Sequence, residues 1–448
     1  MIGSNTAAPG HAFQSNQPVK PAIDYLQRRV QLWATLFTVV LLFEFVPLFS
    51  AIVSGRLGTG QDANDASGSL GLELFSGTVF LGSIVVARLS KVSLQQFLLA
   101  MMPVALMLLW IFTSIAWSNF PDLTAKRAAR LTIETGTAVL LALSTPSQSS
   151  ALRVMFRTFC FITILDLMSW FFPTVSQTPI GFAGIHIHKN GAGEFFFLSI
   201  PIIGLGITNH FITRFRTIAV VSFLAASTML LLTLSKSALG ILMISLGLVA
   251  LMHILNKLHQ SNRVVLATIC VLGASCIAIL VMGYGLDETL DLLYGDATLT
   301  GRDQIWRLLW FLAEKSPLLG VGYGALWQTG PQIESLVEYT GATWVPNEGH
   351  NGYLDILAQV GLVGIACLLV FLSVSFNRLT RYMRIPENKA SAGYKEYALY
   401  VFFGVLIYNI TESSLFRPGQ EVWFMLVYLT TSASLALRRN SLGRDATP

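Results

Sequence analysis

The stretch from Tyr353 to Phe376 reads YLDILAQVGLVGIACLLVFLSVSF. An apolar run of roughly 18 or more residues is long enough to cross the hydrocarbon core of a bilayer as a helix. The run therefore predicts a membrane-spanning helix. His350 and Asn351 stand directly before it, at the end of a long polar stretch. The sequence thus places an imidazole at a membrane surface, where a substrate carried on a lipid could meet it.

The whole chain has the composition of a membrane protein. Hydrophobic residues make up 53% of the 448 residues and charged residues only 12%, whereas soluble domains carry about 25% charged residues. The four cysteines all lie in apolar runs, which favours small packing residues over a metal cluster or a disulfide framework. We predict an all-α polytopic integral membrane protein. About twelve apolar runs of spanning length are centred near Val39, Thr78, Leu106, Val139, Ile162, Leu198, Leu224, Gly247, Val271, Leu368, Leu406 and Leu429.

The distribution of basic residues predicts the orientation. With the N-terminus in the cytoplasm, most of the 29 Lys and Arg residues fall in the inner loops, as the positive-inside rule requires. Topology then accounts for the basic clusters, and nucleic-acid binding is not expected. Because no clear cleavage site follows the first apolar run, a retained anchor is favoured over a signal peptide. We expect a disordered cytoplasmic tail over 1–28, one membrane domain over 29–440 and a second cytoplasmic tail over 441–448.

One outer loop, from about 284 to 350, is long enough to have structure of its own. Apolar residues at helical spacing predict an amphipathic helix from Arg302 to Lys315 that lies on the outer membrane surface. Pro317 would close this helix, and its two tryptophans suit the interface. The glycine-rich segment 320–324 is expected to be a turn, since no strand precedes it. The apolar stripe consists of Ile305, Leu308, Leu309 and Leu312.

Several cations fall on the predicted outer side, where topology gives no reason for them. Arginine offers a planar fork of donors for phosphate oxygens and lysine a compact charge, so a ring of such residues suits a pyrophosphate. Helix N-termini near Asn190 and Asn351 would also favour an anion. No DxD-like carboxylate pair lies nearby to hold magnesium, so we expect chemistry without a metal ion. The cations are Lys126, Arg127, Arg130, Lys189, Lys236, Arg302 and Arg307.

Each of these residues has a second interpretation. Arg127, Arg130 and Arg307 could bind lipid headgroups or extend from helix ends. Lys236 lies between two apolar runs, where a charge is costly and usually functional. Five lone acids in apolar runs could pair with the cations or satisfy helix contacts. Two of these acids lie about one helical turn from the predicted outer end of their helices. They could take part in the chemistry or have a purely structural role. The five are Glu44, Asp166, Glu194, Asp355 and Glu412, and the two near the edge are Glu194 and Asp355.

The residues resemble the O-antigen ligase and Wzy-type polymerase superfamily, and within it the ExoQ-like exopolysaccharide polymerases. His350-Asn351, nine residues, Gly361, two residues and Gly364 are similar to the H[NSQ]-x9-G-x-x-G element of that family. Further ExoQ-like segments extend the similarity over nearly the whole chain. Where the family commonly has an arginine after a serine, this chain has Ser235-Lys236. The segments are Thr300-Gly301-Arg302 with Trp306, Pro317 with Gly320-Val-Gly322, His188-Lys189-Asn190, Trp117-Ser118, and Asn409 through Phe416.

The resemblance implies a GT-C-like helical fold and an active site on the periplasmic face of the bacterial inner membrane. It also implies a saccharide linked to polyprenyl pyrophosphate as the substrate, with no cofactor, and a flippase and a chain-length regulator as candidate partners. His350 would then be the general base or would orient the acceptor, supported by Asn351 and Asn190. Lys189, Lys236 and Arg302 would hold the pyrophosphate.

Three alternatives stay open at this point. His350 could be only an N-capping or interface residue of its helix. The enzyme could ligate a finished glycan onto lipid A-core or a protein, since ligation and polymerisation share their chemistry. A transporter of a lipid or an anionic solute is disfavoured, because matching halves with broken helices are not found and the charges gather on one side.

Overall fold

The computed structural model describes residues 20–46, 70–178, 181–186, 188–257, 302–327, 329, 338, 346, 348–386 and 388–445. Nearly all of the secondary-structure elements in these residues are helices. A two-residue hairpin, β1 (Gln177–Thr178) and β2 (Gly181–Phe182), pairs Gln177 with Phe182. The helices are α1 (Lys20–Phe45), α3 (Leu70–Leu89), α4 (Leu94–Thr113), η2 (Ser114–Ala116), α5 (Pro121–Ser144), α6 (Gln148–Ser169), α7 (Pro173–Ser176), α8 (Lys189–Thr208), α9 (Arg216–Leu232), α10 (Lys236–Lys257), α13 (Arg302–Lys315), α15 (Gly352–Tyr382), η4 (Lys389–Ser391), α16 (Tyr394–Thr411) and α17 (Glu421–Asp445).

The predicted all-helical architecture is confirmed for these residues. The centre of every predicted span lies within a helix, except Val271, which falls outside the described residues. Within the described part of the chain, five segments are long and apolar enough to cross a membrane. The count of twelve spans and the periplasmic position of the long loop stay predictions. The five segments are Leu70–Leu89, Leu94–Ala116, Lys189–Thr208, Lys236–Leu255 and Gly352–Tyr382.

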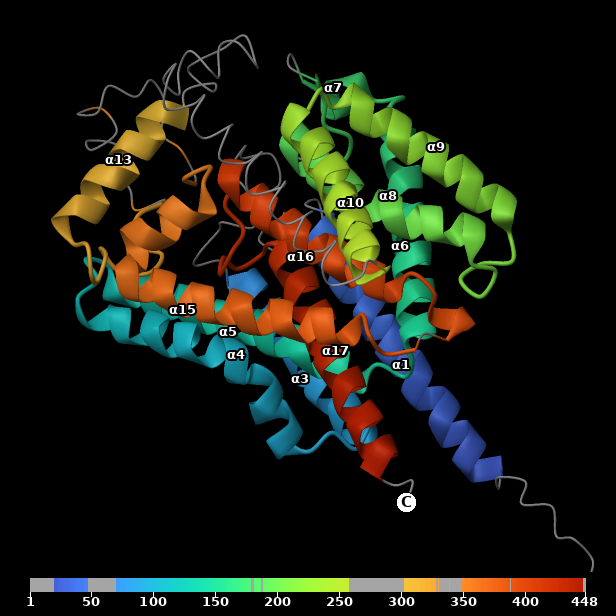
Figure 1. Cartoon of the computed structure of the whole chain (residues 1–448). Helices are drawn as coiled ribbons and strands as arrows, with labels where there is room; N and C mark the ends of the chain where they lie inside the picture. Colours follow the sequence, from blue (N-terminus) through green and yellow to red (C-terminus); the bar gives the residue numbers. More distant parts are fainter. Residues whose placement is uncertain are drawn as a thin grey trace, which may run out of the picture.

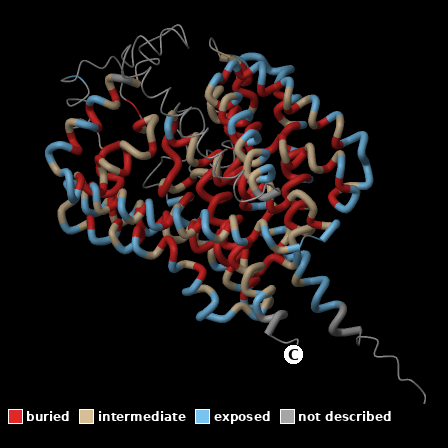
Figure 2. The backbone as a smooth tube through the Cα atoms, in the orientation of Figure 1, coloured by how far each residue is buried: buried red, intermediate tan, exposed pale blue. Residues whose placement is uncertain are grey.

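The outer surface of the helices is apolar, as a lipid-facing surface should be. Leu81 on α3, Met102 on α4, Leu224 on α9 and Met243 on α10 are each at least 60% exposed. Figure 2 shows the exposed residues around the periphery and the buried residues towards the inside. The buried sides of most of these helices pack into one large cluster of apolar and aromatic side chains. Exposed leucines and methionines at this density are typical of a surface that lipid covers.

Helix α15 is central to the part of the structure that concerns function. It packs against α4, α13, α16 and α17, and Figure 1 shows α13 lying over its first half. The predicted amphipathic helix is confirmed as α13, with the predicted bounds Arg302–Lys315. Its apolar stripe is buried and packs against Leu354 and Ala358 of α15. Trp310, on the other side, is 54% exposed, which suits the predicted place at a membrane interface.

Gly361, the first glycine of the motif that begins at His350, has a structural explanation. Gly361 has φ 68° and ψ −169°, so α15 is kinked there. The kink exposes carbonyl oxygens, which accept hydrogen bonds from Val321 N and Gly322 N at 3.0 and 2.9 Å and from Trp110 Nε1 at 2.8 Å. On the other side of the kink, Leu362 N donates to Pro317 O at 2.8 Å. The glycine-rich turn is therefore fastened to the break in α15.

A side chain at position 361 has no room. A Cβ atom built there would lie 2.1 Å from the carbonyl oxygen of Leu318, and the positive φ itself disfavours any L-residue. The turn that follows α13 approaches α15 closely because this glycine has no side chain.

We predict that Gly361→Ala destabilises the protein by more than about 2 kcal/mol, from the left-handed backbone together with the overlap with Leu318. The measurement is the thermal unfolding midpoint of the detergent-purified protein. Gly247→Ala is the control, because a Cβ atom on this helical glycine would meet nothing within 4 Å among the residues that the structure describes. Equal midpoints for the two variants would contradict the role of the kink.

Candidate functional site

His350 is held by the backbone on both sides of it. Asn351 caps α15, and its Oδ1 accepts hydrogen bonds from Tyr353 N and Leu354 N, both at 3.1 Å. On the other side, Gly349 N donates to Asp355 Oδ2 at 3.0 Å, and Gly349 O accepts from Trp306 Nε1 at 3.1 Å. His350 itself has φ 46°, an uncommon value for a residue other than glycine. The capping role belongs to Asn351, so His350 is not the N-cap.

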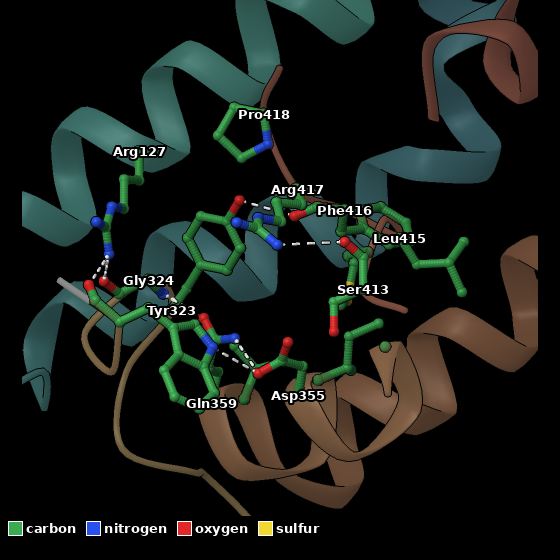
Figure 3. A pocket seen from close by; sticks show the side chains of 15 residues that line it. Arg127, Tyr323, Gly324, Asp355, Gln359, Ser413, Leu415, Phe416, Arg417 and Pro418 are labelled. Carbon is green, nitrogen blue, oxygen red and sulfur yellow. Dashed lines mark hydrogen bonds between the residues drawn. The ribbon is translucent and has the colours of Figure 1, made fainter. Parts of the chain in front are cut away.

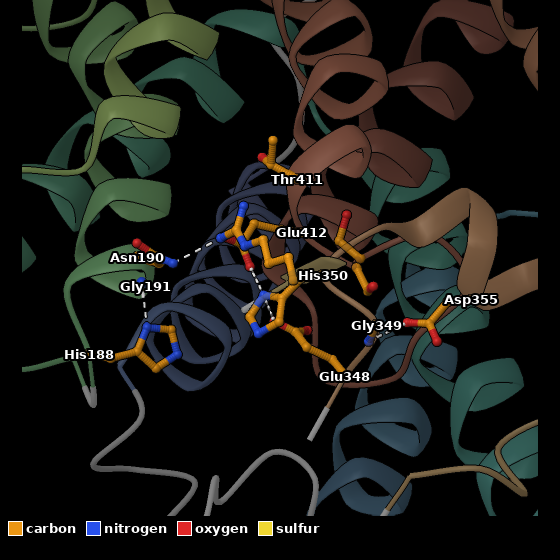
Figure 4. Close-up of polar contacts among 12 residues, drawn as sticks. His188, Asn190, Gly191, Glu348, Gly349, His350, Asp355, Thr411 and Glu412 are labelled. Carbon is orange, nitrogen blue, oxygen red and sulfur yellow. Dashed lines mark hydrogen bonds and ion pairs between the residues drawn. The ribbon is translucent and has the colours of Figure 1, made fainter. Parts of the chain in front are cut away.

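Glu412 is the carboxylate on which the candidate site is built. It follows α16 directly, is 3% exposed, and accepts hydrogen bonds from three other segments. His350 Nδ1 lies 2.8 Å from Oε2, while Arg302 and Asn190 donate to Oε1 at 2.7 and 3.0 Å. Figure 4 shows Asn190 and His350 pointing toward Glu412, and Arg302 reaches the same carboxylate from the start of α13. One buried carboxylate therefore joins segments that are far apart in the sequence.

A second carboxylate, Glu348, lies on the same imidazole. Its Oε1 is 3.4 Å from His350 Nδ1, and its other oxygen forms an ion pair with Arg417. The guanidinium of Arg417 also donates to Ser413 O at 3.4 Å. The site therefore has two carboxylates, two guanidinium groups and one imidazole. Because each carboxylate faces an arginine, the imidazole sits between two ion pairs.

These neighbours shift the titration of the site. Burial opposes the charged imidazolium, but the hydrogen bond that His350 donates to Glu412 and the charges of Glu348 and Glu412 raise the pKa of His350 above its ordinary value. Burial would raise the pKa of Glu412, yet the hydrogen bond and charge of His350 and the charge of Arg302 lower it to about 2. Glu412 is therefore ionised at neutral pH. Its bond to Nδ1 selects Nε2 as the ring atom for acid–base chemistry.

The loop that carries Glu412 is fixed by Asn409. Its Oδ1 accepts hydrogen bonds from Ser414 N at 2.9 Å and Leu415 N at 3.1 Å, and its amide nitrogen donates to Val405 O at 2.8 Å. A Cβ atom on Gly352 would lie 2.1 Å from the same Oδ1. The start of α15 and the end of α16 therefore meet at Asn409. Gly352 N also donates to Glu412 O at 3.0 Å.

The predicted residues of α8 lie at this site or next to it. Asn190 binds Glu412, and Lys189 is the first residue of the same helix. His188 is the N-cap, and its ring accepts a hydrogen bond from Gly191 N at 3.2 Å. Lys236 is the exposed first residue of α10. The turn before it packs on α8, since a Cβ on Gly193 would lie 3.3 Å from Ser235 Cβ.

The predicted residues of α5 lie in a different set of contacts. Arg127 donates to the carbonyl oxygens of Gly324 and Trp327, and Arg130 binds Glu134 with Nε 2.7 Å from Oε1. Arg127 helps to line a cavity of about 60 Å³, which Figure 3 shows beside Tyr323, Asp355 and Arg417. That volume has room for a few water molecules. The role of these two arginines in binding phosphate stays a prediction.

The three remaining predicted residues differ in their surroundings. Asp355 accepts from Gly349 N and from Trp327 Nε1 at 2.7 Å, which braces the backbone before His350. Glu194 is 5% exposed and accepts a hydrogen bond from Tyr408. Arg307 is exposed on α13. Asp355 therefore has a structural role, which is one of the two roles that the sequence left open for it.

A cation could in principle lie between Glu348, His350 and Glu412. One ligand atom from each of the three lies within 4.8 Å of the others. However, Arg302 and Arg417 already neutralise the two carboxylates, and their charges oppose a divalent ion at the same place. The donor set therefore fits an organised acid–base site better than a resident metal.

Comparisons with known proteins agree with the motif. A family model described as O-Antigen ligase matches residues 221–369. The predicted resemblance to this family is confirmed. The match contains Arg302, His350 and Gly361, whereas Asn190 and Glu412 lie outside it.

Two curated proteins are also similar to this chain. The "Exopolysaccharide production protein ExoQ" of Rhizobium meliloti (strain 1021) is 26% identical over 361 residues, which cover 74% of this chain and 78% of that protein. The "Putative polysaccharide ligase" of Rickettsia bellii (strain RML369-C) is 24% identical over 126 residues, or 28% of this chain and 30% of that protein. The similarity to ExoQ therefore extends well beyond the part that the family model matches.

The sequence does not predict that Glu348, Glu412 and Arg417 belong to the site. Glu412 is recognisable as a lone acid in an apolar run, and it lies within the ExoQ-like segment Asn409 through Phe416. Glu348 stands two residues before His350 and Arg417 five after Glu412, but nothing in their spacing indicates an ion pair. Only the packing of α15 against α16 brings them together.

We predict that Glu412→Gln lowers the pKa of His350, because it removes a negative charge that stabilises the imidazolium. The neutral ring would then appear at a lower pH. The rate at which diethyl pyrocarbonate modifies His350, followed by mass spectrometry from about pH 5 to 9, reports the neutral fraction. Glu73→Gln, an exposed acid on α3, should leave the midpoint unchanged. An unchanged or higher midpoint in Glu412→Gln would contradict the proposed coupling.

Proposed function

We propose that this protein polymerises oligosaccharide repeat units linked to polyprenyl pyrophosphate, at the outer face of the bacterial inner membrane. The observation that carries the proposal is the contact of His350 Nδ1 with the buried carboxylate of Glu412, 2.8 Å apart. A carboxylate on one nitrogen of a histidine is the arrangement that prepares the other nitrogen to accept a proton. The similarity to ExoQ along 74% of the chain supports glycan assembly as the setting.

In the proposed reaction, a hydroxyl group of the acceptor sugar attacks the anomeric carbon of the donor. The new bond joins the hydroxyl oxygen to that carbon, and the bond from the carbon to the pyrophosphate oxygen breaks with its electron pair. His350 Nε2 takes the hydroxyl proton, and Glu412 stabilises the resulting imidazolium. Attack opposite the leaving group inverts the anomeric configuration and passes through a state resembling a sugar cation.

The leaving polyprenyl pyrophosphate needs positive charge and hydrogen-bond donors. Arg302 uses one terminal nitrogen to bind Glu412, and a guanidinium has five N–H donors in all, so it can bind a carboxylate and a phosphate together. Lys189 and Lys236 begin two helices packed against each other, and their charges would add to those of the helix N-termini. These fixed donors would stabilise the departing charge in the place of a metal ion.

We expect His350→Ala to reduce polymer formation by at least about 10²-fold, the scale of a lost general base. The amount of protein in the membrane should stay normal, because Asn351 and Asn409 rather than His350 hold the local backbone. His253→Ala, which removes an exposed histidine of α10, is the matched control and should keep wild-type polymer length. Wild-type polymer length in His350→Ala would refute the role of the imidazole.

Ligation is the second candidate, because one similar protein is described as a putative polysaccharide ligase. The two reactions differ in the acceptor. Purified protein supplied only with a lipid-linked repeat unit should produce a ladder of products on a gel, with or without EDTA. A single unreacted band, followed by transfer once lipid A-core is added, would favour the ligase. Loss of the ladder in EDTA would refute metal independence.

A further inference from the structure

A second cavity lies at the other end of the helices that form the candidate site. Its volume is about 340 Å³, within the range of pockets that hold small ligands. Its walls come from the start of α6, the end of α15 and the loop after it, the start of α16 and the second half of α17. Its lining residues include Ser147, Gln148, Tyr382, Lys395, Ser432 and Arg439.

This cavity is separate from the candidate site. Lys395 lies in the first turn of α16 and Glu412 follows its last residue. At 1.5 Å per residue, the two are roughly 25 Å apart along the helix axis. In the predicted topology this end of the molecule faces the cytoplasm, while His350 faces outward. A ligand in the second cavity would therefore not touch the reacting sugars.

Lys395 gives the cavity a buried positive charge. The residue is 5% exposed. Its ammonium group donates to the carbonyl oxygen of Ile385 and lies 5.6 Å from the centre of the Tyr382 ring. Among the described residues, those that line the cavity include a second cation, Arg439, and no Asp or Glu. A buried ammonium that no carboxylate of the cavity wall balances is costly, and an anion in the cavity would lower that cost.

Polar groups suited to an anion surround this charge. Ser147 is the N-cap of α6 and accepts a hydrogen bond from Ser150 N at 3.1 Å, so the N-terminus of a 22-residue helix opens on this cavity. Gln148 donates to the Tyr382 hydroxyl. Ser432, from α17, is buried and also lines the cavity. Four chain segments thus contribute donors and positive charge to one space.

The positive-inside rule does not by itself explain the buried cation in this cavity. It explains why arginines such as Arg381 and Arg384 are exposed at this end. It does not explain why Lys395 is enclosed instead of extending into water, as a long cationic side chain does when it can.

We propose that this cavity is a binding site for a phosphate ester, held by Lys395, Arg439 and the N-terminus of α6. The ester could be the headgroup of an anionic lipid from the adjoining leaflet or a small soluble phosphate compound. Both present the same singly or doubly charged oxygens to the same donors.

The test uses full-length protein in nanodiscs, with two probes. In phosphatidylcholine discs, glycerol 3-phosphate is titrated and its binding is followed by the thermal unfolding midpoint. In a second preparation, phosphatidylglycerol is added and native mass spectrometry counts the lipid that stays bound. We expect Lys395→Gln to weaken binding of the effective probe by about tenfold, the scale of one charge-assisted hydrogen bond. Arg439→Gln should weaken it by a smaller factor.

Arg384→Gln is the matched control, because it removes one exposed charge from the same end of the molecule without touching the cavity. It should bind as the wild type does. A response to glycerol 3-phosphate assigns a soluble ester, and a response to phosphatidylglycerol alone assigns a lipid headgroup. The proposal is overturned if neither probe binds, or if Arg384→Gln and Arg439→Gln weaken binding equally. Arg439→Gln, on an exposed side chain, keeps the test decisive if Lys395→Gln does not fold.

Discussion

The buried carboxylate of Glu412 is the interaction on which the candidate site depends. A charged group that is 3% exposed is costly unless hydrogen bonds and opposite charges surround it. Here His350, Arg302 and Asn190 provide them from three other segments. The same contacts make the site: they fix the imidazole, orient the guanidinium and bring the start of α8 to the end of α16. Removing Glu412 would leave three polar groups without their common partner.

The backbone around α15 explains why these contacts can form. Gly361 breaks the helix, and the turn after α13 fills the break with its N–H groups. This fastening sets α13 over the first half of α15, so that Arg302, at the start of α13, reaches Glu412. Gly320 also has no room for a Cβ atom, because the backbone of Gln359 lies against it. Both glycines therefore allow the turn after α13 to approach α15 closely. His350 and Arg302 are placed by a joint that lies several helical turns away from both of them along the chain.

The sequence predicts most of the helical elements because each has a local signal. Apolar runs locate the helices, and the stripe from Ile305 to Leu312 indicates the bounds of α13. At the site, His350, Asn190 and Arg302 are expected from the sequence and do meet. Glu412 is recognisable only as a lone acid, and Glu348 and Arg417 are not assigned, because an ion pair between distant residues leaves no periodic pattern. Arg127 and Arg130 share the predicted outer position, yet their contacts are with Trp327 and Glu134. The charge of a residue and its predicted side of the membrane therefore do not determine which cations come together at the candidate site.

The two ends of α16 differ in whether their positive charges are paired with carboxylates. Next to Glu412, Arg302 and Arg417 each have a carboxylate partner, so these four charges balance one another. At Lys395, the charged residues among the described lining residues are all cations. If the proposed diphosphate binds beside Glu412, Lys189 and Lys236 must offset its charge, because Arg302 and Arg417 are already paired. A cavity with only cations instead favours an anion that stays bound. The same helix thus joins a site of paired charges to a cavity whose described charged lining residues are all cations.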